Sequence, residues 1–251
     1  MRKIIKPLSL SVILTLALSS PEARAAAGPK AKRAVHAERK VSGLAPKTDL
    51  AFEAEVSIIY DQIDLEQYGL SKQAFEYAYK GYLVLLKKNL VTKSNILSIC
   101  DFSQSSRNRR LYVIDLQQRK ILMNTYVAHG RNSGNEFAYT FSNSNRSHKS
   151  SLGFYVTENT YFGDHGLSLK IHGLEKGFND RADRRAIVVH GSDYVGEQFL
   201  NGNDYNGRSF GCPAVPASES DAIIETIKEG TCLFIYHPTK KYITKSKILN
   251  S

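Results

Sequence analysis

The feature that most constrains the fold of this chain is a series of short apolar runs that begins after Asn95. The segments between the runs are rich in turn-forming residues, and glycine and serine are frequent from Gly130 to Ser151. Many short runs with turn signals between them are typical of a mainly β barrel or sandwich with long loops. The apolar runs span residues 96–99, 111–114, 121–127, 154–156, 169–171, 187–189 and 233–236, and the polar residues 117–119 predict a hairpin between the second and the third.

Two segments before these runs carry apolar residues at helical spacing. The second of them follows Ser71, whose hydroxyl can cap a helix. We expect two amphipathic helices that pack against one side of the β domain, and a separate binding module is the less favoured interpretation. The apolar positions are Phe52, Val56, Ile59 and Ile63 in the first segment and Phe75, Ala78, Tyr79, Tyr82 and Leu86 in the second.

One further helix is predicted near the end of the β region. Ser218 and Asp221 would begin it, because their spacing suits a capping pair. Its apolar face would consist of Ala222, Ile223, Ile224 and Ile227, and Gly230 would end it.

The first 25 residues have the pattern of a secretory signal peptide. Basic residues precede an apolar run at 8–18, and Ala23 and Ala25 form an A-x-A cleavage site. The run is shorter than the roughly 20 apolar residues of a spanning helix, so an uncleaved anchor is less favoured. Residues 26–49 follow as a basic linker with almost no large apolar residues. We therefore predict an exported protein of the periplasm or cell envelope, with no transmembrane segment after cleavage.

The formal net charge of +10 belongs mainly to the ends of the chain. Basic residues are concentrated before residue 50 and in the lysines after residue 237, whereas the stretch between them is nearly neutral. Attraction to anionic envelope polymers, or simple solubilisation of the termini, explains this distribution. We expect no nucleic-acid partner.

The chain has three cysteines, so at least one is left over after any pairing within the chain. Cys100 and Cys232 each border a strand-like run and could form a disulfide if those strands are neighbours. Cys212 is the candidate free thiol.

His190 and Cys212 carry the strongest chemical signal in the sequence. His190 directly follows the β-branched run 187–189, so the sheet should fix its position. Cys212 lies between Gly211 and Pro213, where the backbone can bring a side chain and N–H groups close to a bound carbonyl. A thiol beside an imidazole is suited to nucleophilic acyl transfer, with the imidazole taking the proton or holding the thiolate as an ion pair.

The strand-His-Gly pattern at 187–191 and the Ser-x-Gly-Cys-Pro-Ala-Val pattern at 209–215 resemble the signature of the L,D-transpeptidase family with the YkuD-type catalytic domain. The closer resemblance is to its murein L,D-transpeptidase branch. Four further stretches are similar to blocks of that branch, and together the blocks cover roughly residues 98–236. These stretches are 127–130, 141–143, 150–155 and 173–179.

The resemblance implies a mainly β fold with a YkuD-like sandwich or barrel as the catalytic domain at 98–237. The two predicted helices form an N-terminal segment at 50–97, and one helix follows the cysteine. Residues 238–251 remain as a basic tail with only scattered apolar residues, for which disorder is an option.

The same resemblance implies roles for individual residues. Cys212 corresponds to the nucleophile and His190 to its base. Gly191 and Ser192 correspond to the positions that hold the imidazole by a carbonyl or side-chain hydrogen bond. The N–H groups of Gly211 and Cys212 correspond to the oxyanion hole.

The resemblance also implies substrate contacts by residues near Cys212 and His190. Ser209 and Arg208 would line the entrance, and His172 lies on an alternating strand that could face the same cleft. Phe210 precedes the Gly-Cys pair, at a position where more distant relatives often have His. Ala214 lies two residues after the cysteine, where those relatives often have Arg or Asn. Recognition of a substrate carboxylate would therefore come from elsewhere, with Arg208, Arg131 and Arg185 as candidates.

The reaction implied is attack on the diamino acid carbonyl of a peptidoglycan tetrapeptide stem, with release of D-Ala and a thioester on Cys212. Aminolysis by a second stem gives a 3-3 cross-link, whereas water as acceptor gives L,D-carboxypeptidase activity. Peptidoglycan stem peptides are the expected partners, and carbapenem-type β-lactams are expected acylating inhibitors. We expect a monomer and no cofactor.

Two other classes of function remain as alternatives. A zinc hydrolase could use His172, His190 and Cys212 as ligands, but the short-spaced ligand pairs typical of zinc sites are missing from the sequence. A non-catalytic cell-wall binding module would keep the fold without turnover, and the intact His–Cys pair argues against it.

Overall fold

The computed structural model describes residues 47–251, so the predicted signal peptide and almost all of the predicted linker lie outside the described residues. Within this range, none of the helices combines the length and the apolar character that crossing a membrane requires. The elements are α1 (Lys47–Ile63), α2 (Lys72–Lys87), β1 (Ile96–Asp101), β2 (Leu111–Asp115), β3 (Lys120–Thr125), β4 (Gly153–Gly163), β5 (Gly166–Gly173), the 3-10 helix η1 (Asp183–Arg185), β6 (Val188–Ser192), α3 (Glu197–Leu200), β7 (Ala214–Pro216), α4 (Ala217–Ile227), β8 (Cys232–Tyr236) and α5 (Lys240–Lys245).

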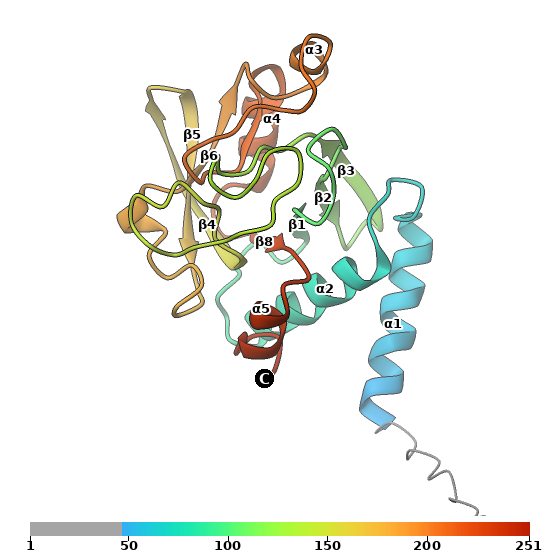
Figure 1. The fold of residues 1–251 in the computed structure, drawn as a ribbon. Helices are drawn as coiled ribbons and strands as arrows, with labels where there is room; N and C mark the ends of the chain where they lie inside the picture. Colours follow the sequence, from blue (N-terminus) through green and yellow to red (C-terminus); the bar gives the residue numbers. More distant parts are fainter. Residues whose placement is uncertain (1–46) are drawn as a thin grey trace, which may run out of the picture. The chain divides into compact units, whose positions relative to one another are not determined.

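The strands of residues 47–251 join one mixed sheet in the order β3-β2-β1-β8-β4-β5-β6-β7 (Figure 1). The β1–β8 and β6–β7 pairs are parallel, and the remaining neighbours are antiparallel. The predicted hairpin is present as β2–β3. Every predicted apolar run overlaps a strand, and the mainly β fold class is confirmed.

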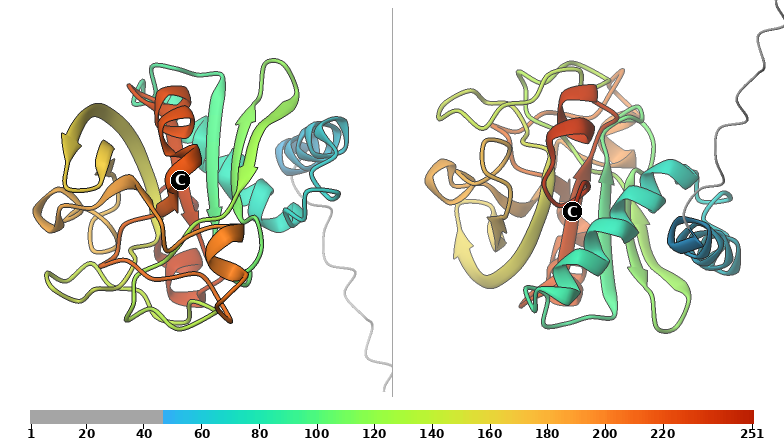
Figure 2. Two further views of the ribbon diagram at one scale, coloured as in Figure 1. Left: turned by 90° about the horizontal axis from the view of Figure 1, so that it is seen from above. Right: turned by 90° about the horizontal axis from the view of Figure 1, so that it is seen from below.

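Helix α2 crosses the sheet over β1 and β8 (Figure 2). The Ser71 hydroxyl caps it by accepting a hydrogen bond from the Ala74 N–H at 3.2 Å, as the sequence predicts. Gly81 faces the Phe154 ring so closely that a Cβ atom there would overlap the ring, so glycine lets the helix approach the sheet. The buried apolar residues of α1, α2 and the sheet belong to one core, so the helices are part of this domain rather than a separate module.

Helix α4 begins and ends differently from the prediction. Strand β7 leads directly into it through Pro216, whose fixed φ suits the start of a helix, so Ser218 lies inside the first turn and does not cap it. The helix ends at Ile227, three residues before Gly230. Its isoleucines are buried, but Ala222 is exposed.

Cys100 and Cys232 lie on neighbouring strands, as a disulfide between them would require, but the register prevents it. The parallel pairing of β1 with β8 sets Leu97 beside Cys232 and Cys100 beside Ile235. This offset separates the two cysteines by about 10 Å along the strands, whereas a disulfide needs Cα atoms within about 7 Å. All three cysteines are free thiols, and Cys100 and Cys232 are buried.

The C-terminal residues are ordered, and a buried carboxylate holds them. The Glu175 carboxylate accepts hydrogen bonds from the Phe154 N–H at 2.9 Å, from the Tyr242 hydroxyl at 2.7 Å and from the Ser246 hydroxyl. We call this group the Glu175 clasp. It attaches α5 to the turn after β5, and Asn179 supports that turn by accepting from the Glu175 N–H at 2.7 Å. The tail is therefore a packed part of the domain.

Substitution of Glu175 by alanine should destabilise the domain, because three buried donors lose their acceptor. Each unsatisfied group costs about 1–3 kcal/mol, so we expect a loss of roughly 3 kcal/mol or more in the free energy of unfolding. Urea unfolding of the purified protein measures this loss. The neighbouring variant Lys176→Ala is the control and should lie within about 0.5 kcal/mol of the unmodified chain. Equal urea midpoints for the two variants would show that the Glu175 clasp does not stabilise the domain.

Candidate active site

Parallel pairing of β6 with β7 brings His190 and Cys212 to one place. The register aligns His190 with Ala214, and Cys212 precedes Ala214 by two residues. Both side chains border a cavity of about 610 Å³, which we call the thiol cavity. Its other lining residues are Tyr161, Gly163, Asp164, His165, Ser168, Arg185, Ala186, Ile187, Val188, Tyr194, Arg208, Ser209 and Phe210.

The His190 imidazole is buried, with 3% of its surface exposed, and is held in one orientation. Its Nδ1 lies 2.9 Å from the Gly191 carbonyl oxygen. A carbonyl oxygen can only accept, so Nδ1 carries the proton and the Nε2 lone pair is left free. Burial lowers the pKa of His190, so the neutral imidazole is favoured. A neutral imidazole with a free Nε2 can act as a base.

Gly191 therefore supplies the backbone carbonyl oxygen that orients the imidazole. A Cβ atom at Gly191 would approach the Ser220 hydroxyl to 2.7 Å, so this position is tightly packed. Ser192 is the last residue of β6, where it pairs with Pro216, and it does not border the thiol cavity.

The Cys212 thiol is half-buried and donates a hydrogen bond to the Ala186 carbonyl oxygen, with an Sγ–O distance of 3.6 Å. Ala186 has a left-handed backbone, with φ of 50°, at the end of η1. Burial raises the pKa of Cys212, while the Val188 N–H, the Arg185 charge and the Cys212 N–H act in the opposite direction. The structure therefore favours a neutral thiol beside a neutral imidazole rather than an ion pair.

The loop before Cys212 has a tightly fixed backbone. Gly211 has φ of 126°, and a Cβ atom there would lie 2.8 Å from the Lys149 carbonyl oxygen, so both conformation and space require glycine. The Gly211 N–H donates to the Ser209 hydroxyl oxygen at 3.0 Å, and that hydroxyl donates to the Cys212 carbonyl oxygen at 2.6 Å. Ser209 therefore organises the loop, and the Gly211 N–H is engaged within it. The N–H groups that act on Sγ are those of Val188 and Cys212.

The three candidate arginines lie in different environments. Arg185 borders the thiol cavity, and its guanidinium donates to the carbonyl oxygens of Ser142 at 2.9 Å and Lys149 at 2.6 Å. Arg208 also borders the cavity and donates to the Asn135 amide oxygen at 2.6 Å. Arg131 is outside the cavity lining and packs over the ring of Phe210, 4.7 Å from its centre.

His172 lies away from His190 and Cys212. Its ring is exposed, and Nδ1 lies 3.1 Å from an Asp183 carboxylate oxygen. It does not border the thiol cavity, so the structure does not place it for contact with a substrate there. The ligand set of the zinc alternative is therefore not assembled, and no metal-binding group of three or more His, Cys, Asp or Glu side chains is found within residues 47–251.

His165 is the clearest member of the site that the sequence analysis missed. It lies at the tip of the β4–β5 hairpin, and its ring stacks on His190 with a centre-to-centre distance of 4.3 Å. The turn residues from Gly163 to Gly166 could have predicted this hairpin, because they separate two runs of strand-forming residues. The contact between the hairpin tip and the His190 ring depends on the register of the strands, and the sequence does not show that register.

The block at 127–130 has a structural role. Arg110 is completely buried and donates to the Val127 carbonyl oxygen at 2.9–3.0 Å and to His129 Nδ1 at 2.8 Å. Burial and the Arg110 charge lower the pKa of His129 to about 3, so this histidine stays neutral. The adjacent backbone pairs with the cysteine loop, because the His129 carbonyl oxygen accepts from the Ser209 N–H at 3.1 Å.

Comparison with known proteins identifies the family. The sequence pattern of the L,D-transpeptidase catalytic domain matches residues 66–236, a region that includes α2 and all eight strands. The chain therefore belongs to the L,D-transpeptidase catalytic domain family. No curated protein matches the sequence.

Similar solved structures include several L,D-transpeptidases. One from Mycobacterium smegmatis is 8% identical, with a TM-score of 0.36, and the match covers 57% of this chain and 59% of that one. An L,D-transpeptidase in complex with imipenem is 10% identical over the same shares, with a TM-score of 0.35. A third, from Xylanimonas cellulosilytica, is 14% identical, covers 66% of this chain and 81% of that one, and has a TM-score of 0.33. The chain thus spans less than two thirds of the first two proteins.

The neutral thiol has a measurable consequence for alkylation. Because burial raises the pKa of Cys212, its thiolate fraction and its rate of reaction with iodoacetamide should rise about tenfold per pH unit through neutrality, without a plateau below pH ~9. Mass spectrometry of the Cys212 peptide over a pH series measures this rate. A plateau below neutral pH would instead indicate a thiolate–imidazolium pair.

Arg185→Ala should slow alkylation of Cys212, because it removes a positive charge near Sγ. Arg184→Ala is the control, since Arg184 is an exposed neighbour, and it should leave the rate unchanged.

Proposed function

We propose that this protein is a cysteine-dependent L,D-transpeptidase that acts on peptidoglycan tetrapeptide stems. The observation that carries the proposal is the shared cavity of Cys212 and His190, in which the Gly191 carbonyl fixes the imidazole with Nε2 free. Family membership supports an enzyme of this class. The predicted signal peptide and linker would deliver the domain, as a monomer, to the periplasm or cell envelope.

The first half-reaction forms a thioester. Rotation of the Cys212 side chain would move the thiol from the Ala186 carbonyl to His190, which takes its proton on Nε2. Sγ then attacks the carbonyl carbon between the diamino acid and D-Ala. The N–H groups of Cys212 and Val188 are the candidates to stabilise the resulting oxyanion, because they are the two that act on Sγ. Collapse of the tetrahedral intermediate breaks the peptide bond, and His190 returns the proton to the departing D-Ala amine.

The second half-reaction releases Cys212. The side-chain amine of a diamino acid in another stem attacks the thioester carbonyl and loses a proton to His190, and the thiol leaves with that proton. The product is a 3-3 cross-link. Water in place of the amine gives a tripeptide, which is the L,D-carboxypeptidase alternative.

Acylation by a carbapenem tests the nucleophile. One of the similar solved structures contains imipenem, which makes this compound a suitable probe. We expect intact-mass spectrometry to show one imipenem adduct on the unmodified chain and none on Cys212→Ala. Cys100→Ala is the matched control, since Cys100 is a buried thiol on β1, and it should keep the adduct. An adduct that survives Cys212→Ala would refute the proposed nucleophile.

Muropeptide analysis tests the reaction and its acceptor. Incubation with tetrapeptide-containing peptidoglycan should yield 3-3 dimers and free D-Ala. His190→Ala should lower kcat by about 10²–10⁴-fold, because proton transfer from the thiol is lost. Tripeptide monomers without dimers would establish water as the acceptor. Muropeptide binding that persists without turnover, and is indifferent to alkylation of Cys212, would favour the non-catalytic binding module.

A further inference from the structure

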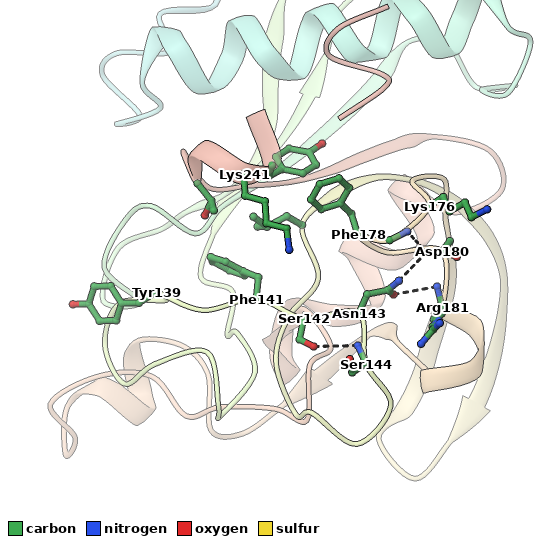
Figure 3. Close-up of a pocket in the computed structure, with 14 residues that line it drawn as sticks. Tyr139, Phe141, Ser142, Asn143, Ser144, Lys176, Phe178, Asp180, Arg181 and Lys241 are labelled. Carbon is green, nitrogen blue, oxygen red and sulfur yellow. Dashed lines mark hydrogen bonds between the residues drawn. The ribbon is translucent and has the colours of Figure 1, made fainter. Parts of the chain in front are cut away.

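A second cavity of about 460 Å³ lies outside the thiol cavity and shares none of its lining residues. Segments that are distant in the sequence line it: the loop at 139–144, Leu152, the turn at 176–181 and the start of α5 (Figure 3). We call it the tail cavity, because the C-terminal residues Thr239, Lys241 and Tyr242 complete it. Its size is within the range of small-ligand sites.

Aromatic side chains form the apolar surface of the tail cavity. The Phe178 ring packs edge-on against Tyr242, with ring centres 5.1 Å apart, and the Phe141 ring lies 4.9 Å from His237. Tyr242 is itself fixed by the Glu175 clasp. Tyr139 adds an exposed ring at the rim. Tyr242 and Phe178 therefore support each other, and a ligand that contacts the Phe178 ring meets a surface that is already arranged.

The charged side chains of the tail cavity are mainly basic. Lys176, Arg181 and Lys241 line it, and none of them belongs to an ion pair among the described residues. Figure 3 shows the Lys241 side chain extending between the Phe141 and Phe178 rings, whereas Lys176 points outward at the edge. Lys241 therefore adds a cation to a lining that also carries the Phe141 and Phe178 rings.

Asp180 contributes a carboxylate to the lining of the tail cavity, and this carboxylate accepts hydrogen bonds from other lining residues. Asp180 Oδ1 accepts from the Gly177 N–H at 2.6 Å and from the Asn143 side-chain amide at 2.7 Å. The Gly177 N–H is the main cause of the lowered pKa of Asp180, so this side chain remains an anion. With three cations and one anion, the lining keeps an excess of positive charge.

We propose that the tail cavity binds an acidic saccharide, that is, a sugar ring that carries a carboxylate or phosphate group. The cations would pair with the anionic group, the rings of Phe141 and Phe178 would contact the C–H face of the sugar, and Asn143 and Ser144 would meet its hydroxyl groups. A peptide ligand would satisfy the cations but would leave the aromatic surface without a matching ring face.

The tail cavity is connected to the thiol cavity through one side chain. Arg185 borders the thiol cavity, and its guanidinium donates to the carbonyl oxygen of Ser142, which lines the tail cavity. A saccharide bound in the tail cavity would thus be held one side chain away from Cys212. The assignment goes beyond the proposed function and does not depend on it, because saccharide binding involves neither Cys212 nor His190.

Calorimetric titration of the purified chain tests the assignment. The main probe is the disaccharide of N-acetylglucosamine and N-acetylmuramic acid, which has a carboxylate but no peptide stem. Neutral chitobiose tests the need for the anion, and N-acetylglucosamine phosphate tests phosphate as its source. We expect both acidic sugars to bind more tightly than chitobiose, and the tighter of the two identifies the source. Binding should weaken as salt is raised.

Two matched double variants locate the binding site. Lys241→Gln with Arg181→Gln removes two cations from the lining, whereas Lys240→Gln with Arg184→Gln removes two exposed cations that are close to them in the sequence but outside the lining. Each lost charged contact should weaken binding roughly tenfold. We expect this loss in the first double variant alone, with unchanged thermal unfolding in both.

Several results would overturn the assignment: no binding of either acidic sugar, equal binding of chitobiose, or equal effects of the two double variants. None of the sugar probes contains the bond cleaved by a transpeptidase. A chain without transpeptidase activity would therefore give the same titration, and failure of the two proposals can be told apart.

Discussion

The arrangement of the thiol cavity depends on the parallel pairing of β6 with β7. Parallel neighbours cannot be joined by a tight turn, so the chain must leave β6 at Ser192 and return through a long crossover to reach Ala214 in register with His190. Hydrogen bonds within the crossover hold its path. The buried Asn206 side chain accepts from the Gly196 N–H at 2.7 Å, and the Gly207 N–H donates to the Tyr194 carbonyl oxygen at 2.7 Å.

The backbone after β3 then fixes the end of that crossover from the other side. The Ala128 N–H donates to the Ala214 carbonyl oxygen at 2.8 Å, and the Arg131 N–H donates to the Ser209 carbonyl oxygen at 2.8 Å, so residues 209–214 are held on both sides of Cys212. Close to this segment lies the buried Arg110 guanidinium, which donates hydrogen bonds to carbonyl oxygens and to a neutral histidine. Within residues 47–251 no carboxylate is among its hydrogen-bond partners. Rigid backbone, rather than a preformed charge pair, therefore positions the thiol.

Local sequence patterns predicted the elements well where periodicity and capping decide the structure. The Ser71 cap, the β2–β3 hairpin and the strand that ends near His190 all follow from residues close together in the chain. The prediction of Cys212 and His190 as one site came from thiol–imidazole chemistry together with motif resemblance, and the structure places both in one cavity. Long-range register was not accessible in this way, since the offset between Cys100 and Cys232 and the stacking of His165 on His190 depend on how strands align. The ordered tail was missed for a related reason: its acceptor, Glu175, is more than sixty residues away from Tyr242.

The central place of β8 in the sheet has a consequence for how this domain can form. β8 joins β1 to β4, yet it comes from residues 232–236 and is the last strand in the order of the described residues. Until those residues are available, β1 to β3 and β4 to β7 are two separate half-sheets, each with an open edge where the other should attach. Closing the sheet brings together segments more than a hundred residues apart, and contacts of such long range slow folding. The sheet should therefore close only after β8 has been synthesised, and insertion of β8 is the late step that joins the half with the predicted catalytic residues to the other half.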